Sequence, residues 1–178
     1  MGYRLLDKIR LHPSGSNVLN KCATPAWGAP FILQNYPFLS PTTASHIANI
    51  LSIYDSWNQK ISSILDFGGG YGGFARCMAM LDPDIKINIV DLPEMQYVQN
   101  QFLSATTSLG DYKYFSDIDD LVSVNVDVFN ASFSFSETPL SYRERIEKFI
   151  IQNSKSVHII FQSRFNGIDN FEYMDHFR

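Results

Sequence analysis

A glycine-rich stretch in the first half of the chain has the residue types and the spacing to bind a ligand. It reads Asp66-Phe67-Gly68-Gly69-Gly70-Tyr71-Gly72-Gly73 and lies between a run rich in β-branched residues and an apolar stripe at helical spacing. Glycine adopts positive φ and lets the backbone approach a ligand closely, and the free N–H groups that begin a helix would face that ligand. In an open α/β sheet, such a turn lies at the carboxyl ends of the strands, where ligands bind.

The carboxylate that begins this turn discriminates between two classes of cofactor. Gly68, Gly70 and Gly73 fit the dinucleotide pattern G-x-G-x-x-G, but a dinucleotide would bring its pyrophosphate to the helix N-terminus, where Asp66 would repel it. S-adenosylmethionine has no phosphate, and the ammonium of its amino-acid end suits a nearby carboxylate. The pattern D-x-G-x-G-x-G, which goes with this cofactor, is matched by Asp66, Gly68, Gly70 and Gly72. We favour S-adenosylmethionine and keep a nicotinamide dinucleotide, hence an oxidoreductase, as an alternative.

A second acid, Asp91, ends the next predicted strand, 19 residues after Gly72. This position suits hydrogen bonds from the hydroxyls of a ribose. Because both cofactors contain a ribose, Asp91 supports a nucleoside without choosing between them. The simplest alternative is that the glycines only make a tight connection and that the acids only cap helices.

The elements around the turn alternate between strand and helix. Ser40 and Pro41 are suited to begin a helix over residues 41–59, and helical spacing recurs after Gly73, after Pro93 and over residues 141–150. Parallel neighbouring strands need crossover connections, so this alternation predicts an α/β fold with a mostly parallel sheet. The predicted strands are 61–67, 85–92, 112–115, 126–133 and 157–161.

The composition is that of an ordinary globular chain. Its 178 residues are 45% hydrophobic, and a formal net charge of −4 gives no electrostatic case for nucleic acid. Cys22 and Cys77 have no metal or redox spacing, and we see no apolar leader and no apolar run of membrane length. The sequence shows no metal-ligand cluster. We expect a cytoplasmic protein with a proline-rich lead-in at residues 1–40 and one ligand-binding domain at 41–178.

Two segments resemble motifs of the class I, Rossmann-like S-adenosylmethionine-dependent methyltransferases. They are residues 64–76, which contain the glycine turn, and Ile89-Val90-Asp91-Leu92-Pro93-Glu94-Met95. Within that superfamily the chain is most similar to a bacterial group of sugar O-methyltransferases, through these motifs, through residues 131–137 and through the lead-in near Trp27-Gly28-Ala29-Pro30. The resemblance implies a Rossmann-like, doubly wound sheet and methyl transfer to a small-molecule or glycan hydroxyl in polysaccharide or glycoconjugate synthesis.

The resemblance also implies roles for individual residues. Those of the glycine turn would hold the methionine end of the cofactor, Asp91 would hold the ribose, and Leu92 would pack against the adenine. Asp117 and Ile118 would contact the adenine edge, and Asn130 would lie beside the methyl group. The cofactor-binding set is Asp66, Gly68, Gly70, Gly72, Asp91, Leu92, Asp117, Ile118 and Asn130.

Methyl transfer from a sulfonium is an in-line displacement whose leaving group is already activated, so alignment of donor and acceptor matters most. A hydroxyl acceptor must also lose its proton, and Glu137, after the fourth predicted strand, is the candidate general base. The alternative interpretation is a helix-capping acid. We expect His158 at the amino edge of the sheet, away from the cofactor, and His176 near the site only if the tail folds over it.

After the fifth predicted strand and the short segment that follows it, only about a dozen residues remain, from Asn166 to Arg178, so the sheet is expected to lack the last two strands of the methyltransferase fold. An uncovered edge strand favours association, which makes a second copy of the chain an expected partner at that edge. A methyltransferase-like scaffold with an incomplete acceptor site is the second alternative function.

Overall fold

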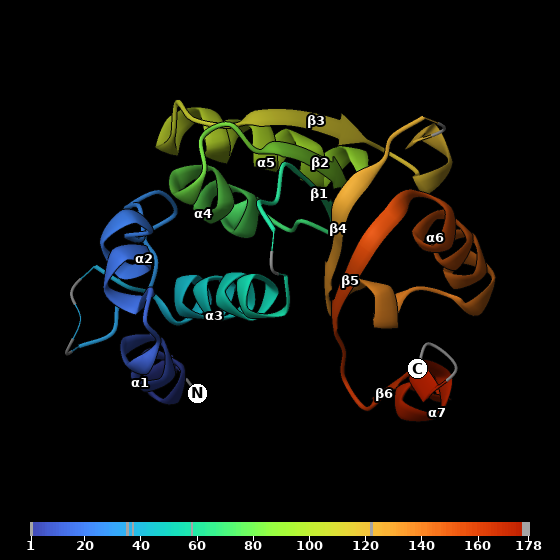
Figure 1. Cartoon of the computed structure of the whole chain (residues 1–178), viewed down its shortest axis with the longest axis horizontal. Coiled ribbons are helices and arrows are strands. Elements are labelled where there is room, and N and C mark those ends of the chain that lie inside the picture. The colour runs from blue at the N-terminus through green and yellow to red at the C-terminus, as the bar shows by residue number, and fades with distance from the viewer. Residues whose placement is uncertain (1, 35, 37, 58, 122, 176–178) are drawn as a thin grey trace.

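Five parallel strands form the centre of the molecule, and helices cover both faces of the sheet (Figure 1). The computed structural model describes residues 2–34, 36, 38–57, 59–121 and 123–175, so His176 lies outside the described residues. The strands are β1 (Ser63–Phe67), β2 (Lys86–Val90), β3 (Asp111–Phe115), β4 (Val126–Ser132) and β5 (Ser154–Ile160).

The strand order confirms the predicted α/β class and the doubly wound sheet. It is β3-β2-β1-β4-β5, and every neighbouring pair is parallel. The chain moves outward from β1 through β2 to β3, then returns to the other side of β1 for β4 and β5. The order therefore reverses between β1 and β4, and in open α/β sheets ligands bind beyond the carboxyl ends of the strands at such a switch point.

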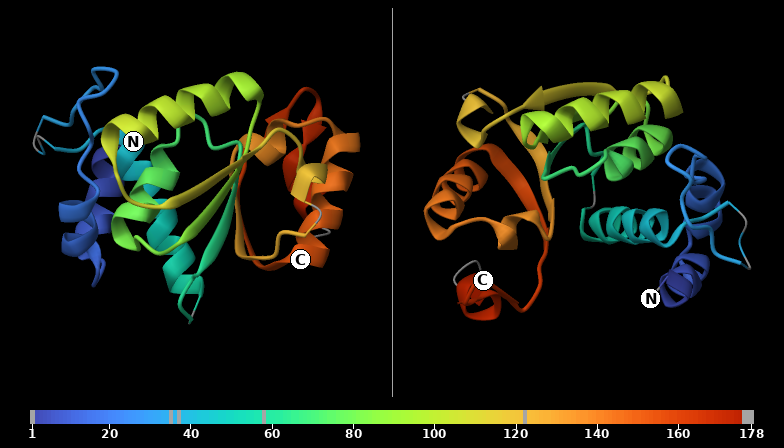
Figure 2. Two further views of the ribbon diagram at one scale, coloured as in Figure 1. Left: turned by 90° about the horizontal axis from the view of Figure 1, so that it is seen from above. Right: turned by 180° about the vertical axis from the view of Figure 1, so that it is seen from behind.

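The helices divide into two layers, which Figure 2 shows from two further directions. Side chains of α1 to α5 join one buried cluster on one face of the sheet, and those of α6 and the two 3-10 helices join a second cluster on the other face. The first layer is α1 (Gly2–Leu11), α2 (Gly15–Lys21), α3 (Pro41–Ser56), α4 (Gly73–Leu81) and α5 (Pro93–Thr106). The second is η1 (Ile118–Leu121), η2 (Ser134–Glu137), α6 (Leu140–Asn153) and α7 (Asn170–Met174).

Helix α3 begins where the sequence predicts. Ser40 is its N-cap, with a side-chain oxygen that accepts a hydrogen bond from the backbone N–H of Thr43 at 3.1 Å, and Pro41 is its first residue. The lead-in before it forms α1 and α2, whose buried Leu6, Ile9 and Val18 belong to the same cluster as the core of α3 and α4. Residues 1–40 therefore contribute to the hydrophobic core.

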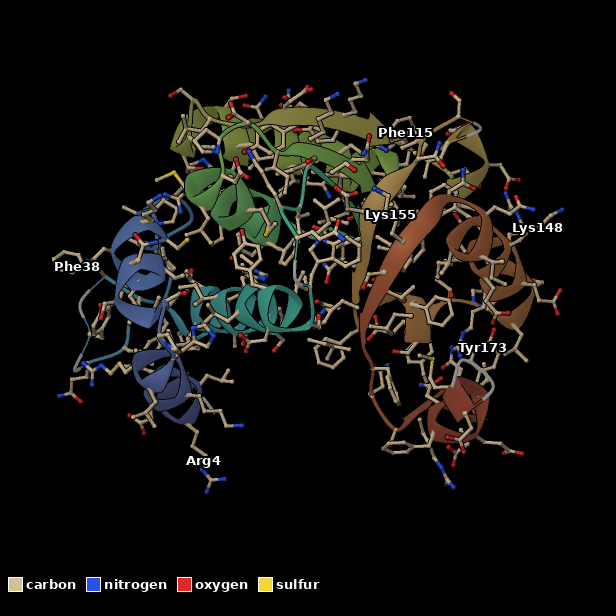
Figure 3. All side chains as sticks on the ribbon, viewed as in Figure 1. Arg4, Phe38, Phe115, Lys148, Lys155 and Tyr173 are labelled. Carbon is tan, nitrogen blue, oxygen red and sulfur yellow. The ribbon has the colours of Figure 1, made fainter. Side chains whose placement is uncertain are left out.

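The fifth strand is longer than predicted, and this corrects the position of His158. It begins at Ser154 rather than at residue 157, because pairing with β4 continues through three polar residues. Lys155, labelled in Figure 3, is one of them, and its Nζ lies 2.7 Å from a carboxylate oxygen of Asp127 on β4. His158 consequently lies in the carboxyl half of β5, so the prediction that it occupies the amino edge is wrong.

After β5 the chain forms a separate antiparallel hairpin, β6 (Arg164–Phe165) and β7 (Ile168–Asp169), and then α7. Tyr173 of α7 faces α6 (Figure 3), where its ring lies under the guanidinium of Arg143 and its hydroxyl donates to Glu147. Within the described residues, none of the helices is long and apolar enough to cross a membrane.

Candidate active site

The glycine turn joins the carboxyl end of β1 to α4, and its backbone uses left-handed conformations. Gly68 has φ of 72° and Gly70 has φ of 56°. A Cβ on Gly68 would stand 2.2 Å from the Cβ of Ser134, whereas one on Gly70 would meet nothing within 4 Å. Gly68 is therefore required for packing against the segment after β4, and Gly70 turns its open side toward space that a ligand can use.

Asp66 is buried at the end of β1, with only 3% of its surface exposed. One carboxylate oxygen accepts a hydrogen bond from Nδ2 of Asn130 at 2.8 Å, while the other has no hydrogen-bond partner in the described part of the chain. Burial raises the pKa of Asp66 to about 7. The hydrogen bond from Asn130 lowers this pKa, and the negative charge of Asp91 raises it further. An acceptor buried without a partner costs free energy, so this oxygen keeps an unused capacity for one hydrogen-bond donor.

The Asp66 carboxyl lines a cavity of about 400 Å³ above the carboxyl ends of β1 and β4. The glycine turn forms one wall, Ser132 and Phe133 a second, and the polar face of α3 a third. That face presents Ser45, His46 and Asn49, and Asn49 donates to the hydroxyl of Ser132 at 3.1 Å, which ties α3 to β4.

A second cavity of about 370 Å³ adjoins the first and shares Pro41, Thr42 and Tyr71 with it. Its other walls come from the lead-in, including Trp27 and Phe31, and from Phe102 of α5. Aromatic side chains therefore form much of the wall of this second space beside the first.

Two neutral groups, His46 and Tyr71, meet in the first cavity. Burial lowers the pKa of His46 to about 4 and raises the pKa of Tyr71 to about 12. The Tyr71 hydroxyl lies 3.5 Å from Nε2 of His46. At neutral pH this wall of the cavity therefore offers hydrogen bonds without charge.

Asp91 connects the end of β2 to the glycine turn. One of its carboxylate oxygens accepts hydrogen bonds from the backbone N–H of Gly70 at 3.0 Å and from Nε2 of Gln99 at 2.8 Å. The other accepts from the backbone N–H of Leu92 at 2.9 Å. Despite these bonds, burial raises the pKa of Asp91. Leu92 itself is 65% exposed, which leaves an apolar surface beside the carboxylate.

The other predicted residues lie further from the cavity. The Asp117 carboxylate pairs with Nη2 of Arg145 at 2.6 Å, and the Ile118 side chain is buried in the cluster that contains α6. Glu137 is exposed at the end of η2, where its carboxylate accepts a hydrogen bond from Gln162 at 3.2 Å. Asn130 is fully buried and reaches the cavity only through Asp66. Among the described residues no cluster of histidine, cysteine or acidic side chains could hold a metal ion.

Neither the cavity-lining residues of α3 nor the contact of His158 with Asn130 was expected from the sequence. The signal on α3 was present: Thr42, Ser45, His46 and Asn49 follow a spacing of three and four that places polar groups on one helical face. His158 had no such signal, because its relation to the site depends on which strands pair.

The donor set fits S-adenosylmethionine. The free oxygen of Asp66 suits an ammonium, Gly70 leaves room for a ligand, and Asp91 with the exposed Leu92 suits a ribose that carries an adenine. A pyrophosphate would instead meet the Asp66 carboxyl in the wall of the cavity.

Residues 38–114, from just before α3 to β3, match the O-methyltransferase domain family. No curated protein matches the sequence significantly.

Solved structures share the fold at low identity. The plantazolicin methyltransferase BpumL, solved with S-adenosylhomocysteine, has a TM-score of 0.52 and 17% identity, over 87% of this chain and 56% of that one. The mitomycin 7-O-methyltransferase MmcR has a TM-score of 0.53 and 12% identity, over 87% and 42%. A protein of Pyrococcus horikoshii described as a candidate RNA methyltransferase has a TM-score of 0.60 and 10% identity, over 94% and 78%.

This chain spans about half the length of the first two of these proteins. The segment that matches by sequence includes β1, the glycine turn and β2. The chain therefore has the Rossmann-like fold of the class I S-adenosylmethionine-dependent methyltransferases, and the part that matches the O-methyltransferase domain family carries Asp66, the glycine turn and Asp91.

Proposed function

We propose that the chain binds S-adenosylmethionine and transfers its methyl group to a hydroxyl oxygen. One observation carries the proposal: the buried carboxylate of Asp66 keeps one oxygen without a partner among the described residues, and this carboxyl lines the 400 Å³ cavity beside the glycine turn. A cation that supplies hydrogen bonds favours the ionised form of such a group. The match to the O-methyltransferase domain family supports the same activity.

When bound, the cofactor supplies a methyl group on a sulfonium, whose leaving group is already activated. Asp66 would hold the ammonium of its amino-acid end, and the backbone at Gly68, Gly70 and Gly72 would let that end approach the turn. Asp91 would accept hydrogen bonds from the ribose, in exchange for or in addition to its bond from Gly70.

The adenine would lie on the exposed surface of Leu92, with its edge toward Asp117 and Ile118. The Asp117 carboxylate is already paired with Arg145. Asn130 would lie close to the methyl-bearing end through its contact with Asp66. The contribution of this chain is to bind, orient and partly desolvate the reactants, which is the main requirement of an in-line methyl transfer.

The proposed acceptor is a hydroxyl of a sugar or glycan, on the strength of the sequence resemblance. Its proton would pass to a general base, and Glu137 is proposed because it is an exposed carboxylate just after β4, at the carboxyl edge of the sheet. Such a base contributes typically about 10²- to 10⁴-fold to the rate. A second copy of the chain at the exposed edge of β5 is proposed as a partner, since an unpaired edge strand offers unused backbone hydrogen bonds.

Calorimetric titration tests the cofactor class. S-adenosylhomocysteine is expected to bind at micromolar concentration, and NAD serves as the control that should not bind. Incubation with S-adenosylmethionine and a panel of free sugars and phenols, read by mass spectrometry for an added methyl group, tests the reaction. Absence of nucleoside binding would overturn the proposed cofactor, whereas binding without methyl transfer would favour a methyltransferase-like scaffold.

A further inference from the structure

Three polar side chains form a row across three neighbouring strands beneath the cavity. In the register of the sheet, Asp66 of β1 lies opposite Asn130 of β4, and Asn130 lies opposite His158 of β5. Residues paired in this way on parallel strands point to the same face of the sheet. Asn130 is fully buried and His158 is half-buried, so each of these groups needs a partner inside the protein.

The chemistry of the three groups sets the direction of their hydrogen bonds. An ionised carboxylate only accepts, so the amide Nδ2 of Asn130 donates to Asp66 across 2.8 Å. The amide oxygen of Asn130 then faces Nδ1 of His158 at 3.0 Å. Because a carbonyl oxygen also only accepts, Nδ1 must carry the proton of the imidazole. The bonds therefore run from His158 to Asn130 to Asp66.

His158 and Asp66 favour the same orientation of the Asn130 amide. Rotation of that amide by half a turn would bring its oxygen against the carboxylate, with two acceptors facing each other at 2.8 Å. The N–H of His158 stabilises the other orientation. Burial lowers the pKa of His158, so the ring is neutral at pH 7 and has a single N–H, which this bond uses.

Asp66 has one other charged neighbour that affects it. The carboxylate of Asp91 opposes its ionisation, and burial opposes it more strongly, while the bond from Asn130 favours it. No cation is among these influences in the described structure. The donor held by His158 is thus the side-chain interaction that favours the anionic form of Asp66.

We propose that His158 is a positioning residue for the amino-acid end of the cofactor, acting through Asn130 on Asp66. This inference rests on the proposed function and adds to it a strand, β5, that lies outside the segment matching the O-methyltransferase domain family. His158 touches neither the cofactor nor the acceptor in this role.

The affinities for two ligands distinguish a positioning role of His158 from a general role in folding. S-adenosylhomocysteine has the amino-acid end, and 5′-methylthioadenosine has the same nucleoside and thioether without it. His158→Phe keeps a ring but removes the donor, and should weaken S-adenosylhomocysteine about fivefold to tenfold, the usual effect of one lost hydrogen bond. It should leave 5′-methylthioadenosine unchanged. His158→Asn, whose amide nitrogen stands near the position of Nδ1, should restore the affinity.

His158→Gln is the second variant, because its side chain is polar but carries the N–H one methylene further from the backbone. It should bind S-adenosylhomocysteine as weakly as His158→Phe does. Ser156→Ala, on the same face of β5, is the matched control and should bind both ligands normally. The pH dependence adds a readout that misfolding would not give. Loss of the donor raises the pKa of Asp66, so the pH below which S-adenosylhomocysteine binding weakens should move upward in His158→Phe.

Each outcome decides something. Selective weakening of S-adenosylhomocysteine with rescue by asparagine supports the inference. If His158→Phe and His158→Gln weaken both ligands equally, or neither, the inference is overturned while the proposed function stands. If the unaltered protein binds neither ligand, the proposed function fails and the inference fails with it.

Discussion

The carboxylate of Asp91 accepts a hydrogen bond from the backbone N–H of Gly70 at 3.0 Å, so the acid at the end of β2 is also a support of the glycine turn. Gln99 of α5 donates to the same carboxylate oxygen and to the backbone oxygen of Gly70. The three residues connect β2, the turn and α5. A change at Asp91 therefore affects the shape of the site as well as its contact with a ribose.

Asp91→Ala should weaken the binding of S-adenosylhomocysteine and of 5′-methylthioadenosine alike, by about 1–3 kcal/mol, because both ligands carry the ribose. It should also lower the melting temperature, since Gly70 loses an acceptor. Glu94→Gln, an exposed acid three residues later, is the control for the change of charge. Titration calorimetry and thermal unfolding measure the two effects, and unchanged affinity for both ligands would remove Asp91 from the site.

Asp66→Asn should separate binding from stability. Folding raises the pKa of Asp66 to about 7. At a pH between the ordinary pKa of an aspartate and about 7, the folded protein therefore keeps a proton that the unfolded chain has released. The contribution of this group to stability is present at low pH and is lost as the pH rises toward and through about 7. The variant has no such titration, so its melting temperature should decline less than that of the unaltered protein between about pH 5 and about pH 8.

The same substitution should abolish the preference for S-adenosylhomocysteine over 5′-methylthioadenosine, because the ammonium loses its carboxylate. Parallel melting curves across this pH range would show that Asp66 does not titrate as described. A preserved ligand preference would show that another group binds the amino-acid end.

Gly68 and Gly70 should respond differently to alanine. At Gly68 the new Cβ would clash with Ser134 in a left-handed conformation, so Gly68→Ala should cost about 2 kcal/mol or more of unfolding free energy. At Gly70 only the conformational cost of about 1 kcal/mol applies, but the Cβ would enter the open side of the turn. Denaturant unfolding should rank Gly68→Ala as the less stable variant, and Gly70→Ala should still weaken S-adenosylhomocysteine. Equal stability of the two would contradict the packing at Ser134.

Glu137→Gln tests the proposed base. It should reduce kcat for methyl transfer by about 100-fold while leaving the affinity for S-adenosylhomocysteine unchanged, because Glu137 does not line the cavity beside the turn. Glu144→Gln, an exposed acid on α6, is the matched control. An unchanged kcat would assign Glu137 a structural role through its bond from Gln162.

The strands and the glycine turn were predictable because each has a local signature: apolar runs between breakers, and glycines after an acid. The start of β5 was predicted three residues too late, since Ser154, Lys155 and Ser156 have no apolar signature and gain their conformation from pairing with β4. That error displaced His158. The row of Asp66, Asn130 and His158 spans residues far apart in the chain and becomes apparent only when the order and register of the strands are known.

The polar face of α3 illustrates a different limit. Its apolar face was sufficient to predict an amphipathic helix, and a polar face is ordinarily turned to solvent. Here the carboxyl edge of the sheet lies opposite part of that polar face, so His46 and Asn49 line a cavity instead. Helical spacing places His46 and Asn49 on one face of the helix, but only tertiary packing decides whether that face meets solvent or a cavity.

Trp27 of the lead-in makes an edge-to-face contact with Phe102, with ring centres 5.4 Å apart, and Phe102 makes another with Tyr71 of the glycine turn at 4.9 Å. An indole is thus linked through one intervening ring to the backbone that would receive the cofactor, while the other tryptophan, Trp57, stands at the far end of α3. The emission of Trp27 should therefore change when a ligand rearranges the turn, which would give the unlabelled protein an intrinsic optical probe of ligand binding.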